Sequence, residues 1–138
     1  MYGARLTLLL VAFWWGSLTT TGFVAVPVLF AKLKSPALAG NVAGHLFEAQ
    51  SWIAIGCALC LLGHSRARAV DTTGAKACDG VVWIIAALLL ALLLQYGVAP
   101  RILARENLRL WHALGSVMYV CQWACASVLL WRMSRRDG

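Results

Sequence analysis

Charged residues are scarce in this sequence. Lys, Arg, Asp and Glu make up 12% of the 138 residues, whereas about a quarter is usual in a water-soluble domain. Hydrophobic residues make up 62%, and the mean hydropathy is +0.77. This composition excludes an ordinary soluble domain and predicts that lipid, rather than water, surrounds most of the chain.

Acidic residues are the scarcest charged type. Five Asp and Glu stand against 12 Lys and Arg, which gives a net charge of +7. The basic residues lie almost entirely between and beyond the apolar runs, where they would face anionic lipid headgroups. No basic stripe with interleaved aromatic residues is present, so we expect no nucleic-acid partner. The expected main partner is the lipid bilayer.

Motifs for catalysis are also missing. The sequence has no H-E-x-x-H zinc motif, no phosphate-binding glycine motif and no serine nucleophile elbow. Four of the five cysteines lie inside apolar runs, which is not the layout of a secreted disulfide framework. We therefore expect a protein that is not an enzyme acting on soluble substrates.

Four apolar segments are each long enough to cross a membrane, which takes roughly 20 residues of helix. Backbone N–H and C=O groups in hydrocarbon must pair within their own segment, so each span is expected to be helical. The sequence thus predicts an all-α integral membrane four-helix bundle that forms one domain over residues 1–138. The spans are expected at about residues 6–30, 36–63, 80–100 and 107–131, with a polar connector over residues 64–79.

Four spans place both termini on the same side of the membrane. Seven Lys and Arg residues flank the spans on that side and five on the opposite side. Positive residues favour the cytoplasmic side. We expect a multi-pass protein of a bacterial inner membrane with both termini in the cytoplasm.

Two prolines suggest an internal repeat. Pro27 and Pro100 each follow an aromatic residue by four positions, Phe23 and Tyr96, near the outer end of spans one and three. Each is followed by a loop and by a helix with a histidine in its early turns. The chain is therefore interpreted as two helical hairpins repeated in parallel. Because proline has no N–H, each should disturb the hydrogen bonding of its helix.

Ionisable residues inside spans are candidates for function, since a charge in lipid is unfavourable. His45 and Glu48 are three positions apart and so share a helix face. Together with His112 and Glu106 they could form a cation site, or the two histidines could ligate haem. Alternatively, His45 and Glu48 bond to each other or to nearby arginines and only fasten the hairpins together.

Other polar residues lie deeper in the spans. Thr20 belongs to a stretch of small and hydroxyl residues in span one, and Gln95, Tyr96 and Gln122 add polarity to spans three and four. Such residues either pack helices together or line a polar path. The candidate ligand-binding residues are His45, Glu48, His112, Gln95, Tyr96 and Thr20, and the candidate metal ligands are His45, Glu48 and His112.

Several motifs resemble a known bacterial family. They are WG at 15–16, FVAVPVLF at 23–30, AGNVAGHLF at 39–47 and LWHALGS at 110–116. The family is called domain of unknown function 4149 and is similar to the eukaryotic transmembrane protein 205 group. The resemblance implies a four-helix inner-membrane protein without an assigned reaction. His45 departs from the Arg or Lys expected after the preceding glycine.

The resemblance and the repeat together indicate structural positions. These are Pro27, Pro100, Gly40, Gly44, Phe30 and Phe47, and the resemblance adds His112 as a position to test.

Three functions remain open at this point. The first is binding or passage of a small ligand or metal ion between the hairpins. The second is a redox membrane protein that uses His45 and His112 with haem or quinone. The third is an accessory subunit of a larger membrane complex. The expected protein partners are a second copy of the chain, in a homo-oligomer, or the other subunits of a membrane complex.

Overall fold

The computed structural model describes residues 2–71 and 78–135, and its regular structure is helical throughout. Four helices are long and apolar enough to cross a membrane: Arg5–Lys32, Pro36–Arg66, Gly80–Leu103 and Leu108–Ser134. The expected all-α four-helix membrane bundle is confirmed for these residues.

The first span consists of α1 (Tyr2–Thr19), the π-helical segment η1 (Thr20–Ala25) and α2 (Val26–Lys32). The second is the single helix α3 (Pro36–Asp71), and the third consists of α4 (Cys78–Leu93), the π-helical segment η2 (Leu94–Val98) and α5 (Ala99–Leu103). The fourth is α6 (Leu108–Ser134).

The connector after the second span differs from the expectation. We predicted an irregular segment over residues 64–79, but α3 stays helical to Asp71, about two turns beyond His64. Residues 72–77 of that connector lie outside the described residues. Polar residues alone do not end a helix, and this stretch has no proline or glycine before residue 74 to stop it.

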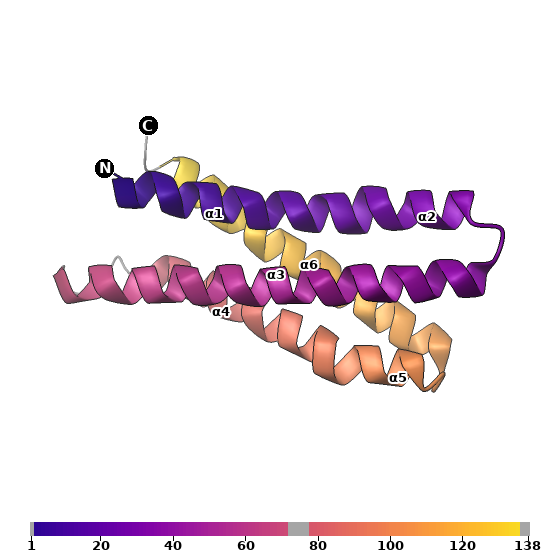
Figure 1. Ribbon diagram of the computed structural model, residues 1–138. Coiled ribbons are helices and arrows are strands. Elements are labelled where there is room, and N and C mark those ends of the chain that lie inside the picture. Colours follow the sequence, from indigo (N-terminus) through magenta and orange to yellow (C-terminus); the bar gives the residue numbers. More distant parts are fainter. Residues whose placement is uncertain (1, 72–77, 136–138) are drawn as a thin grey trace.

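The four spans form a closed ring of neighbours. α1 packs on α3, α3 on α4, α4 on α6 and α6 on α1. α6 crosses the bundle at an angle, and its end lies at the same end of the bundle as the start of α1 (Figure 1). The last helix therefore contacts α1 of the first hairpin as well as α4 of its own hairpin.

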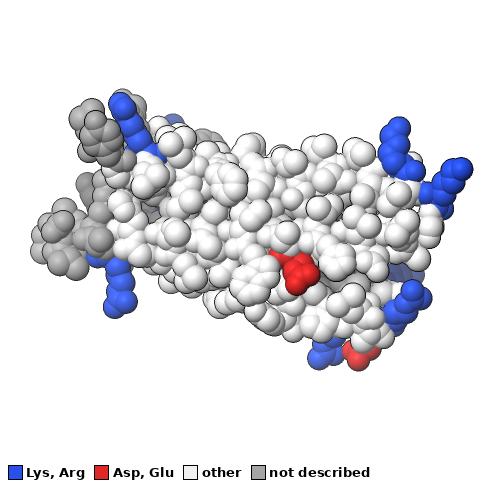
Figure 2. Space-filling view, in the orientation of Figure 1, with Lys and Arg blue, Asp and Glu red and all other residues white. Residues whose placement is uncertain are grey.

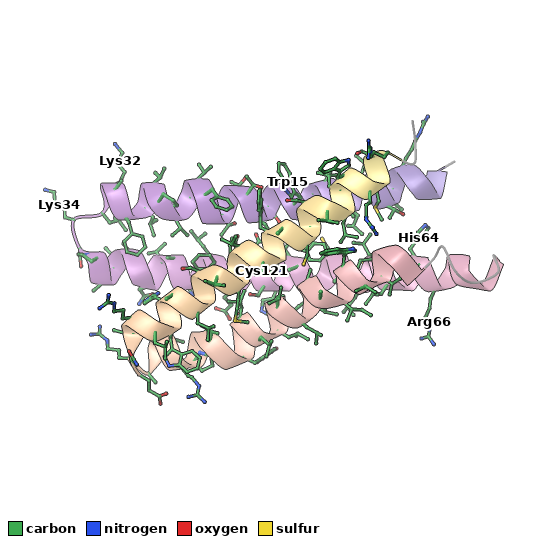
Figure 3. The ribbon with its side chains drawn as sticks, turned by 180° about the vertical axis from the view of Figure 1, so that it is seen from behind. Trp15, Lys32, Lys34, His64, Arg66 and Cys121 are labelled. Carbon is green, nitrogen blue, oxygen red and sulfur yellow. The ribbon has the colours of Figure 1, made fainter. Side chains whose placement is uncertain are left out.

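Charge marks the two ends of the bundle. Lys32 and Lys34 lie at one end, and His64 and Arg66 lie at the other (Figure 3). On the face shown in Figure 2, basic side chains gather at the ends, and the surface between them is uncharged except for one acidic group. An apolar belt between two charged ends is the surface expected of a bundle that crosses a bilayer.

The core is built from residues spaced three or four apart on each helix. Many of them are alanines, which allow helix backbones to approach closely in a membrane. The buried core residues include Val11, Trp14 and Leu18 of α1, Ala54, Ala58 and Leu61 of α3, Ile84, Ala87 and Ala91 of α4, and Tyr119, Ala126 and Leu129 of α6.

Spans one and three change their hydrogen-bond register just before Pro27 and Pro100. The N–H of Val26 pairs with the carbonyl of Thr21, and the N–H of Ala99 pairs with the carbonyl of Leu94. Both bonds reach five residues back rather than four. The missing N–H of proline disrupts the α-helical ladder, and a π turn is one way to absorb such a break. Spans one and three thus resemble each other in structure as well, because each has a π turn just before its proline.

The helix α6 packs against both π segments. The hydroxyl of Tyr119 donates to the carbonyl of Leu18, 2.8 Å away, at the entry to η1. A Cβ added to Gly22 would clash with the Tyr119 ring, and one added to Gly115 would lie 3.3 Å from a methyl carbon of Val98 in η2. Glycine at these positions lets α6 approach both distorted turns.

We expect Gly22→Ala to destabilise the bundle by about 1–3 kcal/mol, because the new methyl group overlaps the Tyr119 ring. Gly16→Ala is the matched control in the same span, since no described atom lies within 4 Å of a Cβ added there. The control should be neutral or slightly stabilising. Unfolding of each variant in mixed micelles, titrated with sodium dodecyl sulfate, measures the difference. Equal stability of the two variants would show that Tyr119 does not need the space beside Gly22.

Candidate functional site

A chain of polar contacts joins α1 and η1 to α3 inside the bundle. Gln50 is 3% exposed. Its Oε1 accepts from Thr21 Oγ1 at 3.1 Å, and its Nε2 donates to Ser17 Oγ at 3.0 Å. The Ser17 hydroxyl in turn donates a hydrogen bond to the Trp14 carbonyl at 2.8 Å. One amide side chain therefore ties the second span to two turns of the first.

A reciprocal pair of contacts joins α1 to α6. Trp15 Nε1 donates to Ser127 Oγ at 2.8 Å, and Trp123 Nε1 donates to Thr19 Oγ1 at 3.0 Å. Each hydroxyl in turn donates to the carbonyl of the other tryptophan: Thr19 to Trp15 and Ser127 to Trp123. The two indole rings lie 6.4 Å apart between centroids. We call these four residues the tryptophan clasp.

Three buried side-chain nitrogens lack a hydrogen-bond partner among the described residues: His64 Nε2, Gln122 Nε2 and Trp14 Nε1. Gln122 is 2% exposed and Trp14 is fully buried, yet Gln122 Nε2 and Trp14 Nε1 have no hydrogen-bond partner there. Gln50 follows Phe47 by three residues on α3, and Gln122 follows Tyr119 by three residues on α6. The rings of Phe47 and Tyr119 are in contact, with 5.2 Å between their centroids, so the two amides lie at a similar depth. The interior thus has one satisfied and one unsatisfied amide at the same level.

The ionisable pair predicted from the sequence lies on the outside of the bundle. His45 Nδ1 is 3.7 Å from Glu48 Oε2, and the two side chains are 77% and 55% exposed. Glu106 does not join them: it pairs with Arg101 at 3.5 Å, in the turn between α5 and α6. The two side chains contact each other on α3 and no second helix, and both interpretations of their role stay predictions.

The other candidate ligands are distributed over several elements. His112 of α6, Tyr96 of η2 and Thr20 of η1 are exposed, and Gln95 is half-buried. In the part of the chain that the structure describes, no group of three His, Cys, Asp or Glu side chains could hold a metal ion. The structure does not gather the sequence-predicted ligands into one site, so their roles in binding stay predictions.

The positions marked by the repeat and the resemblance have mixed surroundings. Pro27, Pro100 and Phe30 are exposed, whereas Phe47 is half-buried against Tyr119. Gly40 and Gly44 are exposed on α3, and no described atom lies within 4 Å of a Cβ added to either. These two glycines therefore make no close helix contact within the chain.

The cysteines inside the spans are free thiols. Cys57 and Cys125 are buried, and Cys60 and Cys121 are exposed. Each pair that is close in sequence thus divides between the inside and the outside of the bundle. Buried Cys57 and Cys125 pack as small apolar side chains inside the bundle.

Three residues that position the interior were not identified from the sequence: Gln50, Trp123 and Ser127. A glutamine in the middle of an apolar span was the available signal for Gln50, because it must find partners inside the membrane. The pairing of the tryptophans with hydroxyls could not be found this way, since it depends on which helices are neighbours.

These features define a class of protein: a multi-pass helical membrane protein with four spans and a hydrogen-bonded polar interior. Residues 9–110 match the family described as Domain of unknown function (DUF4149). The chain belongs to this family, so the family predicted from the motifs is confirmed; the motif at 110–116 lies almost entirely beyond the matched residues. No curated protein and no solved structure matches the chain.

We expect Gln50→Leu to destabilise the bundle by about 1 kcal/mol, because Ser17 and Thr21 lose an interhelical partner. Gln122→Leu is the matched control: it removes an amide of equal burial whose Nε2 has no described partner, so it should be neutral or stabilising. The free energy of unfolding in mixed micelles measures both. If Gln122→Leu is as harmful as Gln50→Leu, the Gln122 amide has a bound partner in the protein as purified.

Proposed function

We propose that this chain is a subunit that associates laterally with other protein in a bacterial inner membrane, as a homo-oligomer or within a larger complex. The observation that supports this is the exposed His45 and Glu48 pair on the outer side of a membrane-spanning helix. We infer that protein, and not lipid, covers this surface in the membrane.

The depth of His45 and Glu48 in the membrane supports this proposal. Glu48 follows Pro36, the first residue of α3, by 12 positions, which is about 18 Å of helix at 1.5 Å per residue. The hydrocarbon core is about 30 Å thick, so the carboxylate lies well inside it. An ionisable side chain at such a depth normally faces a bundle interior or a partner.

The surface around Glu48 suits close association. Gly40, Gly44 and Glu48 repeat every four residues and so lie along one face of α3. Small residues at this spacing let another helix approach, and polar side chains next to them can bond across the interface. A second copy would bring a donor and an acceptor of its own, because His45 and Glu48 are present on both chains.

The proposed orientation rests on charge. More Lys and Arg residues flank the spans at the end that holds the termini, which favours this end for the cytoplasm. The proposal therefore places His64 and Arg66 on the cytoplasmic side and Lys32 and Lys34 on the opposite side.

We expect Glu48→Gln to weaken association by roughly threefold to twentyfold, since an interhelical polar contact in a membrane contributes about 0.6–1.7 kcal/mol. The measurement is the dissociation constant from native mass spectrometry over a dilution series in mild detergent. Glu106→Gln is the control, because it removes a carboxylate that lies between spans and pairs within its own chain.

The same experiment can refute the proposal. A wild-type protein that is purified repeatedly as a lone monomer at every concentration has no stable partner. A Glu48→Gln variant that is more stable than the wild type, with unchanged mass, would mean that the pair faces lipid.

A second candidate function is binding of a small molecule that carries hydrogen-bond acceptors between the hairpins; the metal ion considered from the sequence is not favoured at these N–H donors, which cannot ligate it. Its support is the pair of buried donors, Gln122 Nε2 and Trp14 Nε1, that have no acceptor among the described residues. A bound acceptor would stabilise both donors, since an unpaired buried polar group costs about 1–3 kcal/mol. Native mass spectra should then show a small adduct that is lost in Gln122→Leu, whereas identical spectra for both proteins would remove this candidate.

The redox alternative has a separate test. Haem bound by His45 and His112 would give a Soret band in protein purified from cells supplied with iron. Because both histidines are exposed and do not face the interior of the bundle, where such cofactors are held, we expect the spectrum to lack that band, and its presence would favour the redox function instead.

A further inference from the structure

Polar residues line one exposed face of α3. Asn41, His45 and Glu48 follow one another by four and three positions, so they lie on the same face of the helix, and all three are exposed. His45 Nδ1 lies 3.7 Å from Glu48 Oε2. The helix therefore presents one imidazole nitrogen and one carboxylate next to each other on the outside of the bundle.

These two side chains are ligands of the kind that divalent transition metals bind. Zn²⁺ takes imidazole nitrogen and carboxylate oxygen at about 2.0–2.2 Å in a tetrahedral arrangement, so two ligand atoms of one ion lie about 3.4 Å apart. The observed 3.7 Å between His45 Nδ1 and Glu48 Oε2 is close to that spacing. A His and a Glu three positions apart on one helix are also used as a ligand pair in metal-binding helix bundles.

One chain supplies only half of such a site. Structural zinc sites have four protein ligands, and among the described residues no group of three His, Cys, Asp or Glu side chains could hold a metal ion. A second copy inserted the same way in the membrane would have its α3 parallel to this one. Around a two-fold axis, residues of equal number would then meet at equal depth. The partner would add a second imidazole and a second carboxylate.

Two glycines would permit this approach. Gly40 and Gly44 are exposed, and no described atom lies within 4 Å of a Cβ added to either. Small residues four positions apart let two membrane helices touch, often with a crossing angle of about −40°. Glu48 lies one turn beyond Gly44, where two crossing helices begin to separate. That separation would leave room for the long side chains and for an ion between them.

The balance of charge favours an ion at this interface. Two copies alone would place two carboxylates at one depth in hydrocarbon, where like charges repel and each is poorly solvated. One divalent cation cancels both negative charges, and neutral imidazoles complete its coordination. Mg²⁺ requires six ligands and prefers oxygen, whereas two nitrogen and two oxygen ligands suit an ion such as Zn²⁺.

We propose that two copies of this chain hold one divalent transition-metal ion between their α3 helices, ligated by His45 and Glu48 of each copy. This inference rests on the proposed lateral association and names a second copy as the partner. Binding of the metal and association of the chains are coupled, because the four ligands come together only in the dimer. The ion therefore shifts the equilibrium from single chains to dimers.

The test is native mass spectrometry of the full chain in mild detergent, first treated with EDTA and then titrated with zinc chloride. We expect one Zn²⁺ per two chains. At a Zn²⁺ concentration 100 times its dissociation constant, the dimer should become about 100-fold tighter. His45→Gln and Glu48→Gln should each remove most of this zinc effect. His112→Gln, which changes an exposed histidine of α6, is the matched control and should retain it, and magnesium chloride should not replace zinc chloride.

A second variant distinguishes a shared site from a zinc site on one chain. Gly44→Leu keeps both ligands, and it should leave the fold of the single chain intact, since no described atom lies within 4 Å of a Cβ added there. The larger side chain holds the two α3 helices apart. We therefore expect this variant to lose the species with one Zn²⁺ and two chains.

The outcomes separate this inference from the proposed function. A dimer that forms equally well in EDTA and in zinc chloride would leave the association in place and overturn the metal site. One Zn²⁺ bound to each single chain, with Gly44→Leu unaffected, would also overturn the shared site. A chain that stays monomeric in both solutions would overturn the metal site together with the homo-oligomer.

Discussion

The tryptophan clasp fixes how the first and last spans of this bundle lie against each other. In a bilayer the apolar surface of one helix gains little by leaving lipid for another helix, so packing and polar contacts must set the register. The clasp does this through geometry. Each indole N–H needs a hydroxyl, and each hydroxyl finds its own acceptor on the backbone of its own helix. Sliding α6 along α1 by one turn would break both tryptophan–hydroxyl hydrogen bonds at once.

The contacts of α6 with the two proline-containing spans depend on that register. With α6 held in place, Tyr119 reaches the turn where η1 begins, and Gly115 faces η2. The two residues are four positions apart and lie on one face of the helix. One straight helix therefore supports two distorted ones, each of which has lost a backbone hydrogen bond to a proline. The π turns absorb the breaks in the hydrogen-bond ladder, and α6 packs against both of them.

The sequence predicts the fold well and the candidate site only in part. Length and hydropathy are sufficient for four helices, because hydrocarbon leaves the backbone few alternatives. The equivalence of Pro27 and Pro100 could be seen from spacing alone, and both prolines follow a π turn. The direction in which side chains face could not be predicted, since all sides of these helices are apolar and carry no clear stripe. His45 and Glu48 were therefore recognised as a pair, but their exposure depended on which side of α3 meets its neighbours. Gln50 could be recognised as a polar residue inside a span, but its partners Ser17 and Thr21 could not, because they depend on which side of α3 faces α1.

The length of α3 has a consequence for the surface of the membrane. Its 36 residues would measure about 54 Å as a straight helix, whereas a bilayer with its headgroup regions is about 40–45 Å thick. A strongly tilted helix would fit within that thickness, but a less inclined one must project into water beyond the headgroups. The positive charge of Arg66 is then carried on a stiff helical extension and not on a loop. Such a charge keeps a constant height above the lipid, so a water-soluble protein approaching this side would meet it at a fixed distance from the bilayer.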